Sequence, residues 1–238
     1  MGERALPDGI TLEKNTEQRI NLYYDIYVPS TAQKNMPLLI CLHGYEGNKE
    51  SMMAKARAIN SQDFVIASVQ GPNSFIVRNG EDGNKPRIGF GWMMQYKAEE
   101  TIKLHHTTVS DIIQAARSEY DVDVRRIFLL AFSQSVSLNY RFAFTHPDVI
   151  RGVIGVCGGI PGDWSDSQNK YHDSQTDVLI VAGQQDEFYD IERVKTFKEA
   201  LARRARQVDF YSFPVGHSFP TDALPLINGW LLSQIGRQ

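Results

Sequence analysis

The chain has 238 residues, of which 42% are hydrophobic and 22% are charged, and its formal net charge is -3. This length suits one large domain with a substantial core, so we expect a single domain over residues 1–238. The slightly acidic balance argues against nucleic acid as a partner. The N-terminal residues carry no apolar leader or lipidation signal, which predicts a cytoplasmic protein with no membrane partner; a processed secreted form is the alternative.

Apolar residues alternate with polar ones over 19–28, which is typical of a half-buried strand near the edge of a sheet. Later apolar runs are short and continuous, as expected for parallel strands that are covered on both faces. These runs are 38–42, 64–69, 127–132, 153–156 and 178–182, and a further strand is expected at 208–213.

Helical patterns separate the strands, with apolar residues on one face over 102–120, 191–201 and 224–235. Together the elements predict an α/β fold with a doubly wound, mostly parallel sheet, an antiparallel N-terminal edge and no large cap domain. In such a fold the ligand crevice lies beyond the C-terminal ends of the strands. The position of the site is therefore predicted before its chemistry.

Two segments near the expected crevice carry candidate pocket residues. The stretch 71–92 has five glycines, two prolines and no periodicity, and a loop of this length is often functional. Its last part contains Phe90 and Trp92, while Ile160 and Trp164 follow the strand at 153–156. We expect these side chains to line an apolar pocket for the substrate; packing of loops against the core is the alternative.

Ser133 stands where an apolar strand runs directly into a helical pattern, which is how a nucleophile elbow displays a catalytic serine. The positions two before and two after must be small, and they are Ala131 and Ser135 here, although the pattern G-x-S-x-G has glycines at both. Ser135 also has small residues on both sides, so it is a second candidate. It would lie two residues into the helix, which favours Ser133.

A serine nucleophile needs a base and a carboxylate that orients the base. Asp186 follows the strand at 178–182, and His217 follows the strand at 208–213 in a loop with proline and glycine. Asp190 better suits the N-cap of the next helix. Each residue alone is more often merely solvated, but the order serine, acid, histidine after successive strands is the order that one fold uses for acyl transfer.

At these residues the chain resembles the α/β-hydrolase superfamily, most nearly its phospholipase/carboxylesterase branch, which includes feruloyl-esterase-like and polyhydroxybutyrate-depolymerase-like serine esterases. The resemblance rests on the segments 38–44, 132–134, 183–186 and 216–217. It implies a catalytic triad of Ser133, Asp186 and His217. It also implies an oxyanion hole made by the backbone N–H groups of Tyr45 and Gln134.

No cofactor or metal is expected. Cys41 and Cys157 lie inside apolar strand patterns and are read as buried thiols, and the adjacent His105 and His106 would point to different faces of a helix. Two charged clusters are expected to be solvated, since their spacing is irregular. The first is the loop of Asp163, Asp166, His172 and Asp173, whose alternative is a cation site, and the second is the helix end with Arg203, Arg204 and Arg206. Glu46 is expected to face solvent.

The predicted activity is a serine carboxylic-ester hydrolase that acts on small esters, as a monomer or weak homodimer. One alternative is a catalytically silent protein of the same fold that binds ligands, which the altered elbow favours and the order of the triad opposes. The other is a serine peptidase or acyltransferase that uses the same triad, since the fold does not choose the leaving group.

Overall fold

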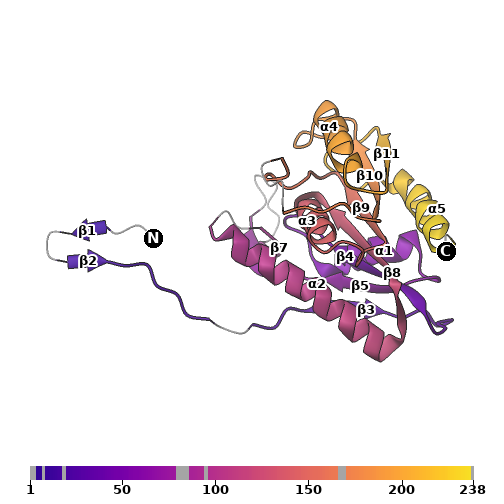
Figure 1. The fold of residues 1–238 in the computed structure, drawn as a ribbon, viewed down its shortest axis with the longest axis horizontal. Coiled ribbons are helices and arrows are strands. Elements are labelled where there is room, and N and C mark those ends of the chain that lie inside the picture. The colour runs from indigo at the N-terminus through magenta and orange to yellow at the C-terminus, as the bar shows by residue number, and fades with distance from the viewer. Residues whose placement is uncertain are drawn as a thin grey trace.

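A seven-stranded sheet forms the centre of the computed structural model, which describes residues 4–6, 9–17, 20–78, 86–93, 96–165 and 170–236. The strand order is β11-β10-β9-β8-β4-β5-β3 (Figure 1). The strands are β3 (Tyr24–Tyr27), β4 (Met36–Leu42), β5 (Val65–Val69), β8 (Val122–Phe132), β9 (Gly152–Val156), β10 (Asp177–Gly183) and β11 (Gln207–Phe213). All neighbouring pairs are parallel except β3 and β5, so the predicted mostly parallel sheet with an antiparallel N-terminal edge is confirmed.

Helices cover both faces of the sheet, because the buried strands alternate their side chains between two apolar clusters. On β4, Leu38, Ile40 and Leu42 belong to one cluster and Leu39 and Cys41 to the other. The first cluster includes residues of α2 (Ala98–Tyr120), α3 (Val136–Thr145) and α4 (Ile191–Ala202), and the second includes residues of α1 (Lys49–Ile59) and α5 (Leu224–Ile235). This is the doubly wound arrangement that the continuous apolar runs predict.

Helix α1 is absent from the sequence-based prediction. Its buried side chains are Met52, Ala56 and Ile59, which form a narrow apolar stripe among charged and small residues. Asn48 caps its start by accepting a hydrogen bond from the Ser51 backbone N–H at 2.8 Å. A stripe of three residues is too weak a periodic signal to separate a helix from a loop.

The stretch 71–92, predicted as a loop, contains a hairpin instead. Strands β6 (Asn73–Val77) and β7 (Arg87–Gly91) pair antiparallel, and residues 79–85 between them lie outside the described part of the chain. Ile76 and Ile88 are paired across the hairpin and both are more than 60% exposed, at 64% and 63%. Because these apolar side chains face solvent, burial periodicity gives no sign of the hairpin.

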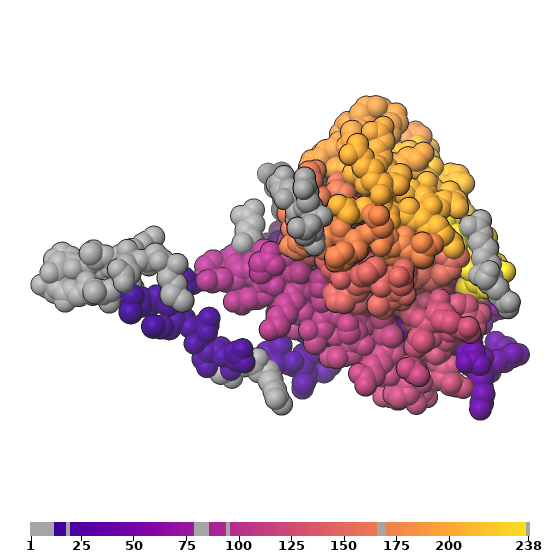
Figure 2. Space-filling view, viewed as in Figure 1, coloured from indigo at the N-terminus to yellow at the C-terminus, as the bar shows by residue number. Residues whose placement is uncertain are grey.

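The N-terminal segment is placed apart from the sheet. Strands β1 (Arg4–Leu6) and β2 (Gly9–Thr11) pair only with each other, and the exposed residues 12–17 extend outward from the rest of the chain (Figure 1, Figure 2). Glu13 accepts a hydrogen bond from the Tyr96 hydroxyl at 2.5 Å and pairs with Lys97 at 3.0 Å. Among the helices of the described residues, none has the length and apolar composition needed to cross a bilayer.

A buried histidine links the stability of this fold to pH. Burial lowers the pKa of His105 from 6.5 to about 3, and its Nε2–H donates to the Asn139 side-chain oxygen at 3.2 Å. Since the unfolded histidine binds a proton more readily, stability is full above pH 6.5 and is lost as the pH falls toward about 3. We expect the free energy of unfolding to drop by about 3 kcal/mol between pH 6.5 and 4 through His105.

Urea denaturation at a series of pH values measures this loss. His105→Gln flattens the slope of the unfolding free energy against pH, even if it lowers stability at every pH. The matched control is His172→Gln, because His172 is exposed. An unchanged slope in His105→Gln would contradict the assignment.

Candidate active site

Ser133 occupies a strained turn between β8 and the helical segment that leads into α3. Its φ is +58°, in the left-handed region that a residue with a side chain rarely adopts, and its side chain is 9% exposed. A short 3-10 turn from Ser133 to Ser135 follows, and α3 begins at Val136. The strand, strained serine and helix are the arrangement of a nucleophile elbow.

The structure brings the three predicted triad residues together. The Ser133 Oγ lies 2.7 Å from Nε2 of His217, and the His217 Nδ1 lies 2.9 Å from Oδ2 of Asp186. With the Nδ1 proton donated to Asp186, Nε2 is free to accept the hydroxyl proton of Ser133. All three residues follow the C-terminal ends of parallel strands, namely β8, β10 and β11, as the sequence predicts.

The Asp186 carboxylate is held by backbone groups of its own loop as well as by His217. Its Oδ1 accepts hydrogen bonds from the backbone N–H groups of Phe188 at 2.9 Å and Tyr189 at 3.0 Å. The carboxylate side chain is 1% exposed. Phe188 makes an edge contact with the histidine ring and Tyr189 stacks on it, with ring centroids 4.8 and 5.8 Å away. Asp190 caps α4, as predicted.

The sequence-based prediction includes His43 in the segment 38–44 but gives no role to its side chain, which organises the loop after β4. Its Nδ1–H donates to the Gly44 carbonyl at 2.7 Å, and its Nε2 accepts from the Gly71 N–H at 2.9 Å. Burial lowers the pKa of this imidazole, which matches a neutral ring with one donor and one acceptor nitrogen. His43 is 2% exposed and thus serves as an internal brace. The sequence signal was a histidine directly before Gly44 at the end of an apolar strand.

The carbonyl group of His43 is held from two directions. The Trp92 indole N–H donates to it at 2.9 Å, and the Ser135 hydroxyl lies 2.9 Å from it. The Ser135 Oγ also lies 3.1 Å from the carbonyl oxygens of Leu42 and Phe132, and the residue has no exposed surface. Ser135 therefore ties the elbow to the loop after β4, and its hydroxyl does not face the histidine base. The second candidate nucleophile is thus wrong.

Two glycines, one in β9 and one just after it, allow close packing around the elbow. Ala131 pairs with Gly155 of β9, where an added Cβ would lie 2.4 Å from the Tyr140 hydroxyl. At Gly158 an added Cβ would lie 2.4 Å from Val136 and 2.7 Å from the Ser133 carbonyl oxygen. Close packing against the elbow and the start of α3 therefore depends on glycines in β9 and directly after it.

Tyr45 and Gln134, whose backbone N–H groups are the predicted oxyanion donors, directly follow Gly44 and Ser133, two residues that lie against each other. Gly44 lies against the elbow, since an added Cβ would stand 3.1 Å from the Ser133 Cβ. Gln134 is in the first helical turn, where N–H groups lack an intrahelical acceptor. Within the described part of the chain, neither N–H donates to another backbone carbonyl. The Gln134 side chain is engaged, because its Oε1 accepts from the Trp92 N–H at 2.7 Å.

The pocket candidates have mixed outcomes. Trp92 is 1% exposed and belongs to the core, so the prediction that it lines a pocket is wrong; its indole packs beneath the loop that it hydrogen-bonds. Phe90 is half-buried and donates its backbone N–H to Gly47 at 3.2 Å. Ile160 and Trp164 both line a cleft, although Trp164 is only 6% exposed and also packs in the core.

Two clefts flank the triad. The first, which we name the aromatic cleft, measures about 320 Å³ and is bounded by Tyr189, which stacks on His217. Its residues are Ser137, Gly159, Ile160, Pro161, Gly162, Trp164, Ser165, Tyr189, Arg193 and Phe197. The second, which we name the lysine cleft, measures about 390 Å³ and includes His217 itself. Its residues are His43, Gly44, Tyr45, Gly47, Ser51, Met52, Lys55, Phe132, His217, Ser218 and Phe219.

Both cysteines are free and buried, as predicted. Cys157 lies at the end of β9, and its thiol donates to the Ser218 carbonyl at 3.2 Å. Burial, together with the charge of Asp186, raises the pKa of Cys157 to about 12. This thiol is therefore protonated and packs behind the acid of the triad.

The charged clusters are more ordered than predicted. Asp163 accepts hydrogen bonds from Arg141, Lys170 and Tyr171, so it anchors its loop and is not simply solvated. Asp173 pairs with Arg204 at 3.7 Å, His172 is exposed, and Asp166 lies outside the described residues. Glu46 pairs with Arg87 at 3.1 Å. Among the described residues no three potential ligands are grouped to hold a metal ion.

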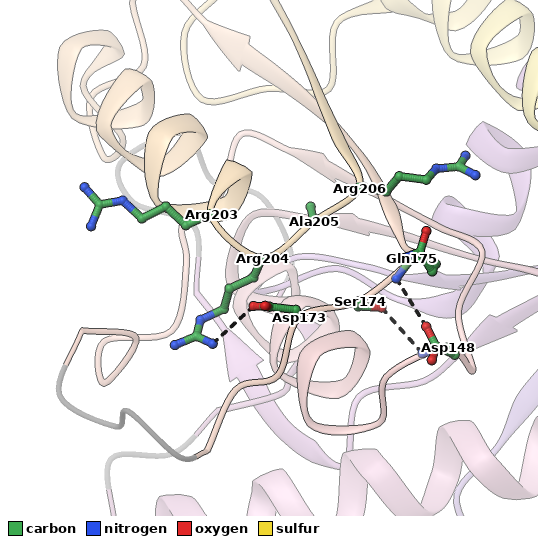
Figure 3. A pocket seen from close by; sticks show the side chains of 8 residues that line it. All are labelled: Asp148, Asp173, Ser174, Gln175, Arg203, Arg204, Ala205 and Arg206. Carbon is green, nitrogen blue, oxygen red and sulfur yellow. Dashed lines mark hydrogen bonds and ion pairs between the residues drawn. The ribbon is translucent and has the colours of Figure 1, made fainter.

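A third hollow lies at the opposite end of the sheet (Figure 3). Its residues are Asp148, Asp173, Ser174, Gln175, Arg203, Arg204, Ala205 and Arg206, which precede β9, β10 and β11. Arg206 bonds the buried carboxylate of Asp177, and Arg204 bonds the Tyr171 carbonyl, so the prediction of a purely solvated basic face is wrong for these two. This hollow lies at the N-terminal strand ends, away from the triad.

Comparisons with known proteins identify the family and the fold. The model of the phospholipase/carboxylesterase family matches residues 25–233. The fold is similar to the carboxylesterase of Bacillus cereus, with a TM-score of 0.67 and 19% identity over 90% of this chain and 94% of that chain. It is also similar to the carboxylesterase from Mesorhizobium loti, with a TM-score of 0.68 and 18% identity over 89% of this chain and 94% of that chain. A third similar structure is the phospholipase/carboxylesterase from Dyadobacter fermentans, with a TM-score of 0.66 and 18% identity over 92% of this chain and 100% of that chain.

A search of curated proteins found no match. The structural likeness, at identities below 20%, shows the fold, while the family match extends over most of the chain. From the residues matched, 25–233, the chain belongs to the phospholipase/carboxylesterase family of the α/β-hydrolase superfamily.

Proposed function

We propose that this protein is a serine carboxylic-ester hydrolase that acts on small esters through an acyl-enzyme on Ser133. The observation that carries the proposal is the chain of hydrogen bonds from Ser133 through His217 to Asp186, at 2.7 and 2.9 Å. The left-handed backbone at Ser133 and the family match support it. In this assignment Ser133 is the nucleophile, His217 the base and Asp186 the residue that orients the base.

In the first half of the reaction, the Ser133 Oγ attacks the ester carbonyl carbon while its proton moves to Nε2 of His217. The carbonyl oxygen becomes an oxyanion, which the N–H groups of Tyr45 and Gln134 stabilise. Each such donor is worth about 3 kcal/mol of the barrier. The imidazolium then gives its proton to the leaving alcohol, and the acyl group remains on Ser133.

In the second half, a water molecule loses a proton to the same nitrogen of His217 and attacks the acyl carbon. The oxyanion collapses, Ser133 regains its proton, and a carboxylic acid leaves. The negative charge of Asp186 stabilises the imidazolium in both halves. No metal or cofactor enters these steps, because the chain's own groups supply the nucleophile, base and oxyanion donors.

The clefts support a small substrate. At about 320 and 390 Å³ the aromatic and lysine clefts lie at the lower end of the usual range for ligand sites. Aromatic and aliphatic side chains line both, as apolar acyl or aryl groups require. We therefore propose that the two sides of the ester occupy the two clefts, with the carbonyl carbon at Ser133 between them.

The direct test is hydrolysis of short-chain p-nitrophenyl esters, compared with matched p-nitroanilides, together with labelling by a fluorophosphonate probe. We expect release of nitrophenol, no cleavage of the anilides, and labelling of the wild type but not of Ser133→Ala. Absence of labelling in the wild type would favour a silent binding protein. Cleavage of anilides at rates like those of the esters would favour a peptidase.

A further inference from the structure

We propose that Lys55 binds a carboxylate on the substrate, so that this hydrolase prefers esters that carry one negative charge. The inference rests on the proposed function, because it assigns a class of substrate to the same site. It depends on the lysine cleft, one wall of which is His217.

The lysine cleft combines apolar side chains with hydroxyl and imidazole groups and a single lysine. Met52, Phe132 and Phe219 supply apolar surface, and Lys55 is the only lysine, arginine, aspartate or glutamate among the described residues that line it. A charged group in a cleft orients a ligand more strongly than the same group on an open surface, since less water competes for it.

Helix α1 directs Lys55 into this cleft. Met52 and Lys55 are three residues apart on α1, so they share one face of the helix, and both line the cleft. Met52 is 2% exposed, whereas Lys55 is half-buried. The aliphatic stem can thus lie along the cleft wall while the ammonium group stays at the rim.

Within the described part of the chain, the Lys55 ammonium group forms no ion pair with an acidic side chain. Two carboxylates that neighbour cleft residues in the chain are already paired with cations. Glu46 pairs with Arg87 at 3.1 Å, and Glu50 pairs with Lys49 at 2.9 Å. The charge of Lys55 is therefore available to a ligand.

The aromatic cleft makes a useful contrast. Its own cation, Arg193, lies over the ring of Phe197, with 5.5 Å between the guanidinium carbon and the ring centre. That contact partly satisfies the guanidinium within the protein. Among the described residues that line the two clefts, Arg193 has an aromatic partner whereas Lys55 forms no ion pair, and one ammonium group matches one carboxylate. We assign the anionic end of the substrate to this cleft and the apolar end to the aromatic cleft.

The experiment compares charged esters with neutral esters of the same size. One pair, p-nitrophenyl hydrogen glutarate and its methyl ester, carries the charge on the acyl side. The other, 4-(butanoyloxy)benzoate and its methyl ester, carries it on the alcohol side. For at least one pair we expect wild type to prefer the anion in kcat/KM, and Lys55→Met to lower this anion-to-neutral ratio about fivefold. Lys55→Glu lowers the ratio further, and added salt weakens the wild-type preference.

Lys103→Met is the matched control, because Lys103 is exposed on α2 and lines neither cleft. It leaves the ratio unchanged. If Lys55→Met leaves the ratio within twofold of wild type for both pairs, the inference is overturned, while ester hydrolysis by Ser133 still stands.

Binding supplies a readout that does not need turnover. Isothermal titration of Ser133→Ala with each charged ester gives a Kd, and adding Lys55→Met raises it about fivefold for the preferred ester if the inference is correct. Equal values with and without Lys55→Met contradict it. Failure of every ester to be hydrolysed by wild type would instead count against the proposed function, and the titration would still decide the role of Lys55.

Discussion

Replacing Ser133 by alanine lowers kcat/KM for a p-nitrophenyl ester by at least about 10⁴-fold, since without the hydroxyl no acyl-enzyme forms. The residual rate comes from water that is positioned by the oxyanion donors and the base. The fold is expected to persist, because the left-handed backbone at φ +58° costs about as much conformational free energy for alanine as for serine. Steady-state kinetics and the melting temperature, measured on the same preparation, separate the two effects.

Two serine variants sharpen this result. Ser135→Ala still labels with a fluorophosphonate, although it loses the hydroxyl that holds the His43 carbonyl and is about 1 kcal/mol less stable. Ser118→Ala, on the exposed side of α2, behaves as wild type. Full activity in Ser133→Ala, or loss of labelling in Ser135→Ala without loss of fold, would overturn the assignment of the nucleophile.

Replacing Asp186 by asparagine lowers kcat by about 10⁴-fold, for a reason that the surrounding hydrogen bonds make specific. The N–H groups of Phe188 and Tyr189 both point at Oδ1, so the single amide oxygen of asparagine takes that place. The amide NH₂ then faces Nδ1 of His217. That nitrogen must accept, the proton shifts to Nε2, and the imidazole no longer takes the Ser133 proton.

Asp190→Asn is the matched control, with the same chemical change four residues away. Asp190 caps α4 by accepting from the N–H groups of Glu192 and Arg193, and asparagine caps a helix equally well. We expect its kcat within twofold of wild type. The measurement is kcat for one nitrophenyl ester at neutral pH, with circular dichroism as a check on folding; a small loss in Asp186→Asn would show that the carboxylate does not set the tautomer.

The sheet was largely predictable because its strands are buried on both faces. Continuous apolar runs at β4, β8, β9 and β10 leave few other interpretations, and their order places the loops that follow them at one edge. Helix α1 and the hairpin of β6 and β7 were missed, since the first buries only three side chains and the second exposes isoleucines. Periodicity reports burial, and these elements bury little.

The triad was predictable from chain order, whereas the supports around it were not. Ser133, Asp186 and His217 each follow a recognisable strand, so their meeting follows from topology. Trp92 was misread because its role depends on a contact with His43, which is 49 residues away in the chain. Contacts between residues so far apart in the chain leave no pattern in the local sequence. Lys55 could not be assigned to the site from the sequence, because its position depends on helix α1.

Two hydrogen bonds to the His43 carbonyl connect the hairpin and the elbow to the same loop. Through the Trp92 indole, the chain that leaves β7 is fastened to the same peptide group that Ser135 fastens from the elbow. A substitution in the hairpin that displaces Trp92 would therefore also displace the loop after β4. The exposed hairpin and the buried loop beside Ser133 are thus joined through one indole N–H.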